Sequence, residues 1–224
     1  MRGMLTVFGN EWTGFLRSDR SVFTIYAILV LVWSIVLASN MNLLALDANI
    51  LWWVFFSVVV SSNFANTTFV SERLTGSLEI VLTCGLSRMA ILLGKIAYVI
   101  FMSVVLGLLC YAFGILWALI AGEDAVLMLQ TMNLAQLILV YLSACFMNAC
   151  CGAWLSVHLT NPRLSHFANL LVLGLVVGGH AVISTLTPLS AWVLPGVLCA
   201  AGVLFLLLAA RGFAGEKVVQ PFTV

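Results

Sequence analysis

The stretch SERLTGSLEIVLTCGLSRMAILLGKI, residues 71–96, is the longest polar interruption between two apolar runs of membrane-spanning length. Leu78, Val81 and Leu82 recur in it at the i, i+3, i+4 spacing, which predicts a short helix over residues 77–83 with these three side chains on one face. We therefore expect this segment to contact something outside the two helices that flank it.

The residues around the short helix fit its two ends and the start of the next helix. Glu79 falls in its first turn, where a carboxylate suits the helix dipole, and Gly85 can end it because glycine tolerates the left-handed conformation. Ser87 can cap the following helix. Arg88 and Lys95 lie in the first turns of that helix, so we expect both side chains to extend towards the membrane surface.

The amino-acid composition indicates whether water or lipid surrounds this chain. Of its 224 residues, 63% are hydrophobic and only 8% are charged. One soluble core cannot bury that much apolar surface, so the sequence predicts an all-α polytopic membrane protein. The net charge of +1 and the lack of any basic run indicate no nucleic-acid partner. Residues 1–20 lack the apolar run and cleavage site of a secretory signal, so we expect no processing.

Six apolar runs within residues 22–210 are each close to or above the ~17–25 residues that cross a bilayer as a helix. The third run would be about 50 Å long at 1.5 Å per residue, so it must tilt, bend or protrude. One or two re-entrant turns fit between the fifth and sixth runs, where Gly178, Gly179, Pro188 and Pro195 weaken regular helix. The predicted spans are residues 22–39, 50–70, 89–121, 132–157, 167–187 and 192–210.

The N-terminal segment, residues 1–21, is expected to form an amphipathic helix that lies in the headgroup plane. Trp12 and Phe15 belong to its apolar side, whereas Glu11 and Arg17 fall on its polar side. Such a helix either only positions the first span or offers a surface to a partner, and the pattern leaves both possibilities open.

The basic residues decide the expected orientation. None lies in residues 40–49, 122–131 or 188–191, so a six-span arrangement puts all of them on one side, which the positive-inside rule identifies as the cytoplasm. Both termini, including the tail at residues 211–224, and the 71–88 loop are then cytoplasmic. The nine basic residues are Arg2, Arg17, Arg20, Arg73, Arg88, Lys95, Arg163, Arg211 and Lys217.

Motifs for catalysis are missing from the sequence. It contains no phosphate-binding loop, zinc-protease motif or nucleophile elbow, so we expect no catalysis and no ATP hydrolysis by this chain. Metal ligation is not expected either, because the adjacent Cys150 and Cys151 have neither C-x-x-C spacing nor a third ligand nearby.

Polar residues inside predicted spans are the candidate positions for a translocation path. Asn63, Asn66 and Thr67 occupy i, i+3 and i+4 of the second run, where they either hydrogen-bond to a neighbouring helix or line the path. His180 lies within the fifth run and either bonds to a neighbouring helix or serves as a ligand or proton-relay group.

The polar stretch and the N-terminal segment resemble a known family. The stretch is similar to the E-[RK]-x-x-G-[ST]-L-E...S-[RK]...L-G-K pattern of the permease subunits of type-2 ABC exporters, through Glu72-Arg73, Gly76-Ser77-Leu78-Glu79, Ser87-Arg88 and Leu93-Gly94-Lys95. Glu11-Trp12 and Leu16-Arg17-Ser18 are similar to the opening of the family's connector helix. The chain departs from the pattern before Ser87, where many members carry a proline and this chain has Cys84-Gly85-Leu86.

The resemblance implies six spans, a cytoplasmic connector helix and a coupling helix in the 71–88 loop. It also implies a homo- or heterodimer of permeases in a bacterial cytoplasmic membrane, bound to two separate ABC ATPase subunits. ATP and Mg²⁺ would be held by those subunits, and this chain would hold no cofactor. The ATPase-coupling residues would be Glu72, Gly76, Leu78, Glu79, Val81, Leu82, Ser87 and Arg88, and the connector helix would use Trp12, Phe15 and Arg17.

Two hypotheses from other classes remain open. An intramembrane enzyme, or a redox or haem-handling subunit, could be built around His180 and the cysteines of the apolar runs, and it would lose activity in His180→Ala without any ATPase partner. A membrane scaffold could recruit complexes through the 71–88 loop, and its complexes would show no nucleotide dependence. The sequence does not identify a cargo.

Overall fold

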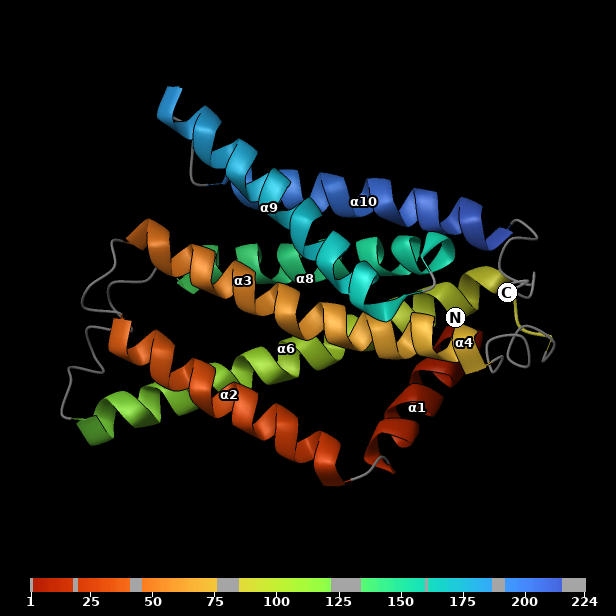
Figure 1. The fold of residues 1–224 in the computed structure, drawn as a ribbon, viewed down its shortest axis with the longest axis horizontal. Coiled ribbons are helices and arrows are strands. Elements are labelled where there is room, and N and C mark those ends of the chain that lie inside the picture. Colours follow the sequence, from red (N-terminus) through yellow and green to blue (C-terminus); the bar gives the residue numbers. More distant parts are fainter. Residues whose placement is uncertain are drawn as a thin grey trace.

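The computed structural model describes residues 2–17, 20–40, 46–75, 85–121, 134–159, 161–186 and 192–214. These ranges are helical apart from short turns and contain no strand, which confirms the all-α prediction (Figure 1). In chain order the elements are α1 (Arg2–Leu16), α2 (Arg20–Asn40), α3 (Leu46–Ala65), the π-helix η1 (Asn66–Ser71), α4 (Glu72–Thr75), α6 (Arg88–Ala121), α8 (Leu134–His158), α9 (Pro162–Leu186) and α10 (Val193–Ala214).

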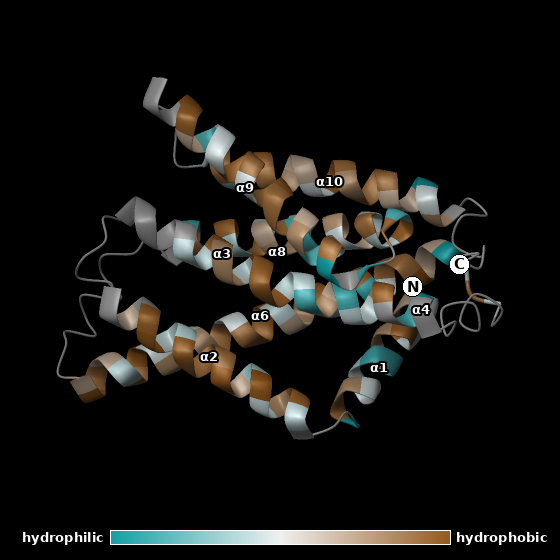
Figure 2. Ribbon diagram, viewed as in Figure 1, coloured by the Kyte–Doolittle hydropathy of each residue, from teal (hydrophilic) through white to brown (hydrophobic). Residues whose placement is uncertain are grey.

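Five helical segments in the described ranges are long and apolar enough to cross a membrane: Trp52–Val70, Arg88–Ala121, Ala135–His158, Arg163–Ile183 and Val193–Phe213. The helices α1 and α2 meet the same criterion only as a pair, and they meet at an angle of 92°. Hydrophobic residues run along the length of the long helices (Figure 2). The chain therefore has a membrane-protein fold with five candidate spans, or six if the bent pair forms one.

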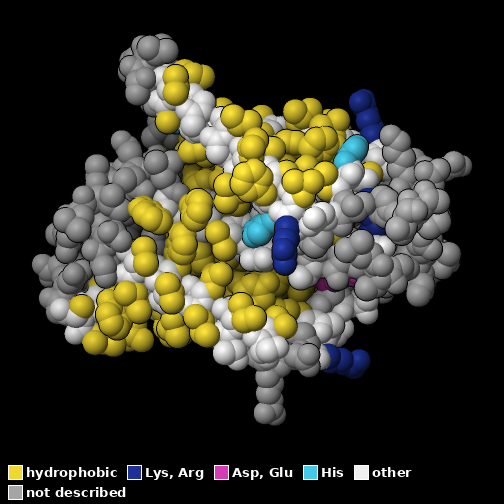
Figure 3. Space-filling view, viewed as in Figure 1, with side chains coloured by type: hydrophobic (Ala, Val, Ile, Leu, Met, Phe, Trp, Pro, Cys, Tyr) yellow, Lys and Arg dark blue, Asp and Glu magenta, His cyan; other side chains and the backbone are white. Residues whose placement is uncertain are grey.

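Successive long helices run in opposite directions, so the end of each helix and the start of the next lie at the same end of the bundle (Figure 1). The end of α4 and the starts of α6 and α9 lie at one end, together with the last turn of α10. Hydrophobic side chains cover much of the face seen in Figure 3, and the Lys and Arg side chains visible there lie in the half of the molecule nearer this end.

Small residues allow α8 to pack closely against its neighbours α3, α6, α9 and α10. A β-carbon at Gly152 of α8 would lie 2.5 Å from the β-carbon of Ala65 in α3, so glycine is what permits this crossing. At another crossing, a β-carbon at Gly202 of α10 would lie 2.5 Å from the ring of Phe146 in α8. Close approach through small residues is the usual way in which helices associate in lipid.

The helix α1 lies against α6 rather than apart from the bundle. A β-carbon at Gly94 of α6 would lie 2.8 Å from the carbonyl oxygen of Met4 and from the β-carbon of Val7, so the two backbones nearly touch. Further along α1, the ring of Phe8 packs edge-on against Phe101 with 5.4 Å between centroids. These contacts fix the side of α1 that faces the bundle.

The helix boundaries differ from the predicted runs mainly near the C-terminal half. The third run is confirmed as one continuous helix, α6. The helix α9 begins at Pro162, before the predicted start of the fifth run, because proline suits the first helical position. It continues through Gly178 and Gly179, where we expected weakened helix. The expected re-entrant turns involve residues 187–191, which lie outside the described residues.

Candidate functional site

The last turns of the second predicted run form the π-helix η1 instead of a regular α-helix. The backbone N–H of Glu72 donates to the carbonyl oxygen of Phe69, whereas a regular α-helix would use the carbonyl of Thr68. The Thr68 carbonyl oxygen accepts a hydrogen bond from Lys95 Nζ at 3.2 Å. Single π-turns of this kind often occur at functional sites.

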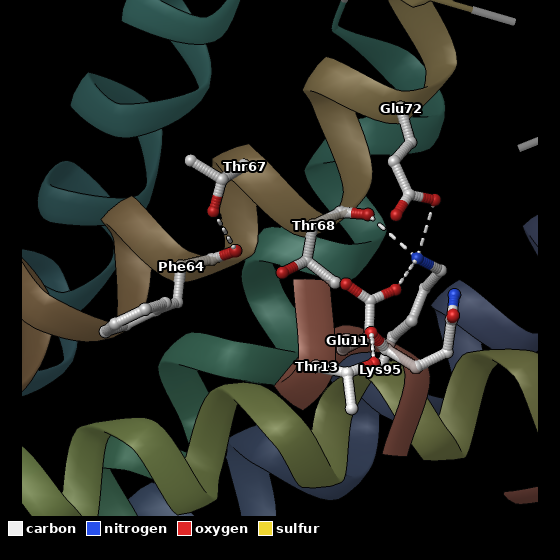
Figure 4. Close-up of polar contacts among 8 residues, drawn as sticks. Glu11, Thr13, Phe64, Thr67, Thr68, Glu72 and Lys95 are labelled. Carbon is white, nitrogen blue, oxygen red and sulfur yellow. Dashed lines mark hydrogen bonds and ion pairs between the residues drawn. The ribbon is translucent and has the colours of Figure 1, made fainter. Parts of the chain in front are cut away.

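Lys95 is the centre of a buried ion-pair cluster that joins three parts of the chain (Figure 4). Its Nζ donates to Glu72 Oε2 in α4 at 2.6 Å and to Glu11 Oε1 in α1. Lys95 is 1% exposed, and the ring centroid of Phe69 lies 6.0 Å from Nζ. We refer to Lys95, Glu11, Glu72 and the Thr68 carbonyl as the Lys95 cluster. The expectation that Lys95 extends to the membrane surface is therefore wrong.

The Lys95 cluster contains two carboxyl groups and one ammonium group. Burial is the main reason that the pKa of Glu11 lies above its ordinary value, and the neighbouring Glu72 carboxylate adds to this effect, while Lys95 opposes it. Glu11 is turned towards the bundle and only 14% exposed, although the sequence pattern placed it on the polar side of α1. The cluster has an excess of negative charge when both carboxyl groups are ionised.

Arg73 connects the same segment to the end of α8. Its Nη1 donates to the carbonyl oxygens of Ser156 at 2.6 Å and Val157 at 2.8 Å, in the last turn of that helix. A cationic donor is favourable there, because the last carbonyls of a helix lack partners and carry the negative end of the helix dipole. Burial lowers the pKa of Arg73 from its ordinary value.

The C-terminal flank of the polar stretch is also bonded to another helix. Gly85 has a φ of 73°, which confirms the left-handed conformation expected of it. The Ser87 hydroxyl oxygen accepts a hydrogen bond from the Ala90 N–H at 3.2 Å, so Ser87 caps α6 as expected. Arg88 Nη1 donates to the carbonyl oxygen of Phe213 at 3.3 Å, near the end of α10. Both flanks of the stretch are thus bonded to other helices.

The middle of the polar stretch, residues 76–84, lies outside the described residues. It includes Gly76 and the four residues of the expected coupling contact, which are Leu78, Glu79, Val81 and Leu82. The short helix over residues 77–83 stays a prediction.

The three connector-helix residues have different surroundings. The ring of Trp12 packs edge-on against Phe101 with 5.5 Å between centroids. Phe15 lies among three aromatic rings, one of which is Phe23 at 4.9 Å. Arg17 is exposed and follows the last residue of α1. Two of the three residues therefore anchor α1 on the bundle, and one faces outwards.

The candidate path residues do not form one group. Asn63 Nδ2 donates to the carbonyl oxygen of Val59 at 2.9 Å, and Thr67 Oγ1 donates to the carbonyl oxygen of Phe64 at 3.0 Å. Both bonds connect residues of the continuous helical segment that α3 and η1 form. Asn66 begins η1. His180 lies about 27 Å along α9 from Pro162, towards the opposite end of the bundle, and its buried Nε2 has no hydrogen-bond partner among the described residues.

Among the polar residues inside the predicted spans, the hydrogen bonds between helices come instead from residues that we did not select as path candidates. Asn169 Nδ2 in α9 donates to the hydroxyl oxygen of Ser62 in α3 at 2.8 Å and to the carbonyl oxygen of Asn148 in α8 at 3.3 Å. The hydroxyl groups of Ser61 and Ser103 lie 2.8 Å apart between α3 and α6. An asparagine within an apolar run was the available signal for Asn148 and Asn169.

Comparison with known proteins identifies no relative of this chain. No family model, no curated protein and no solved structure matches this chain.

Proposed function

We propose that this chain is the permease subunit of a type-2 ABC exporter, with six spans, α1 as an interfacial connector helix and a coupling helix within residues 76–84. The observation that carries the proposal is that both flanks of this segment are bonded to the ends of other helices. Arg73 is bonded to α8 on one side and Arg88 to α10 on the other. A segment held in this way can transmit a displacement to the bundle.

The Lys95 cluster extends this connection to α1. Glu72 lies only four residues before the segment and is bonded through Lys95 to Glu11. A force on residues 76–84 would therefore reach α6 and α1 through ion pairs, in addition to α8 and α10 through the arginines. The resemblance assigns Glu72 and Arg88 to the contact with an ATPase, and we propose that they act by holding the coupling segment rather than by touching the partner.

The charge distribution supports a cytoplasmic position for this end of the bundle. Arg73, Arg88 and Lys95 adjoin the segment, and Arg163 and Arg211 lie in the first turn of α9 and the last turn of α10. Basic residues accumulate on the cytoplasmic side of membrane proteins. Both termini would then be cytoplasmic, where two separate ATPase subunits can reach the coupling helix.

The proposed mechanism is alternating access driven by the partner subunits. ATP and Mg²⁺ bind to the ATPases, whose closure displaces the coupling helices of two permease copies, and the paired bundles rearrange to release cargo outwards. Asn63, Asn66 and Thr67 in α3 and η1, and His180 in α9, are the proposed path residues. This chain would bind no nucleotide and catalyse no reaction.

The test is nucleotide-dependent activity of the complex purified from its native membrane through a tag on this chain. We expect a co-purified subunit with a phosphate-binding loop, and ATP turnover that falls at least tenfold in Leu82→Asp and Glu79→Ala. Glu216→Ala in the C-terminal tail is the matched carboxylate control and should keep full turnover. Unchanged turnover and unchanged partner recovery in Leu82→Asp and Glu79→Ala would contradict the proposal. A complex without nucleotide dependence would favour a scaffold.

A further inference from the structure

A cavity of about 160 Å³ lies between α3, α6 and α8, in the half of the bundle away from the Lys95 cluster. Two of its lining residues lie near the start of a candidate span: Trp53 is the second residue of Trp52–Val70, and Leu137 is the third residue of Ala135–His158. Tyr111, a third lining residue, lies about 35 Å along α6 from the start of that helix. The cavity therefore lies where the hydrocarbon of a bilayer meets the headgroups.

The walls of the cavity are almost entirely apolar. An apolar cavity of this volume can hold a group of about the size of benzene, which is also about the size of an ester with its first few methylene groups. Leu108 of α6 and Ile138 of α8 belong to the walls and are 65% and 52% exposed, so the cavity opens on the surface between these two helices. At this depth that surface faces lipid, so a ligand would enter from the membrane.

Three aromatic residues of the walls carry a polar atom. The Tyr141 hydroxyl group donates to the carbonyl oxygen of Ser103 at 2.7 Å. Trp53 Nε1 and the Tyr111 hydroxyl oxygen are also buried, but neither has a hydrogen-bond partner within the described part of the chain. The ring centroids of these two residues lie 6.1 Å apart. Buried polar groups normally have a partner, so these two neighbouring groups are available to a ligand.

The two available groups indicate the chemistry of the ligand. Trp53 Nε1–H can only donate, and the Tyr111 hydroxyl group can donate as well, so the complementary atom is an acceptor with two lone pairs, such as a carbonyl oxygen. A water molecule could accept from the same donors. However, a buried water usually makes about three hydrogen bonds, and it would leave the apolar part of the cavity unfilled. An apolar chain that ends in a carbonyl group fits both parts.

We propose that this cavity binds the acyl ester of a lipid, carried by a phospholipid or by a neutral acyl ester without a headgroup. The ester carbonyl oxygen accepts from Trp53 Nε1 and from the Tyr111 hydroxyl group, and the first methylene groups fill the apolar part. Both polar atoms are buried in this conformation, so the two rings turn towards the ester on binding. The depth of the cavity matches the depth at which Trp and Tyr side chains meet the polar part of a bilayer. The inference does not rest on the proposed transport function.

The test is native mass spectrometry of the full chain in dodecyl maltoside, a detergent without an ester. The chain is titrated with a diacyl phosphatidylcholine or with its dialkyl ether analogue of the same chain length, which lacks only the carbonyl oxygens. One neutral hydrogen bond changes affinity about fivefold, so we expect two bonds to favour the diester about 25-fold.

Two conservative variants remove the donors one at a time. Trp53→Phe and Tyr111→Phe should each weaken diester binding about fivefold and leave diether binding unchanged. Neither should destabilise the fold, because each removes a polar atom that has no partner in the protein. Trp33→Phe is the matched control, since it also removes a buried, unpartnered Nε1–H but lies outside the cavity, and it should change neither affinity. Leu108→Trp, at the exposed mouth, should weaken binding of both lipids.

A second arm separates the two sources of the ester. Displacement of the diester lipid by methyl hexadecanoate, but not by hexadecyl methyl ether, would support a site for any acyl ester. A preference for the diester lipid without displacement by methyl hexadecanoate would support a phospholipid as the ligand. Equal affinity for the diester and the diether would overturn the proposal. A preference for the diester that persists in both Trp53→Phe and Tyr111→Phe would also overturn it, because the ester would then bind elsewhere.

Discussion

Replacing Lys95 with methionine should destabilise the chain more than any other single substitution of a basic residue. Methionine keeps most of the side-chain volume but removes the ammonium group that pairs with the carboxyl groups of Glu11 and Glu72. Removing one partner of a buried ion pair costs about 3–5 kcal/mol. Glu11 and Glu72 are 14% and 24% exposed, so some water reaches them and the lower value, about 3 kcal/mol, applies.

The loss can be measured as a midpoint of thermal unfolding in detergent. For a chain of this size about 3 kcal/mol corresponds to a decrease of about 6–12 °C. A thiol-reactive dye reports the transition, because Cys145, Cys150 and Cys151 are buried and become accessible on unfolding. Arg163→Met removes an exposed basic side chain and should shift the midpoint by less than about 2 °C.

The pH dependence and a double-mutant cycle test the cause of this loss. Without the ammonium group, the folded variant should hold protons on its carboxyl groups more tightly than the unfolded chain does, so its stability should fall further as the pH rises. Adding Glu72→Gln to Lys95→Met should recover part of the loss, because the repulsion between the Glu11 and Glu72 carboxylates is removed. A small shift in Lys95→Met, or strictly additive effects in the double variant, would refute this account of the cluster.

Three further predictions concern neighbouring contacts, each measured by the same unfolding assay. Arg73→Ala should cost about 2 kcal/mol because the last carbonyls of α8 lose a charged donor, while Arg163→Ala should change little. Gly94→Ala should cost about 2 kcal/mol and make α1 accessible to protease, since the added methyl group meets the α1 backbone, whereas Gly174→Ala has free space and should be neutral or stabilising. The raised pKa of Glu11 predicts that the parent chain loses stability as the pH rises from 4.5 through the raised value, and Glu11→Gln should remove this slope.

The sequence was sufficient for features that depend on neighbouring residues. Apolar runs of membrane length located the long helices, including the continuous α6, because a span must satisfy its backbone within itself. The conformation of Gly85 and the cap at Ser87 were also predicted, since both follow from local backbone chemistry. The π-helix η1 was not predicted, because the apolar run continues through it without a break.

The partners across the bundle could not be predicted in the same way. Lys95 lies 84 residues from Glu11 in the chain, and helical periodicity gives the face of a residue but not its partner. A basic residue near the end of a span is generally expected to extend to the membrane surface. This expectation did not predict the buried Lys95 cluster. The pairing of Asn169 with Ser62 depends likewise on how α3 and α9 cross.

The π-helix η1 also has a consequence for the comparison of sequences. A π-turn accommodates one residue more than a regular α-helical turn, so a related chain with a single deletion between Asn66 and Ser71 could form an unbroken α-helix. The residue aligned with Glu72 would keep its direction towards the lysine. A deletion elsewhere in α3 would instead rotate that residue by about 100° around the helix axis. Alignments of distant relatives should therefore place a gap within these six residues.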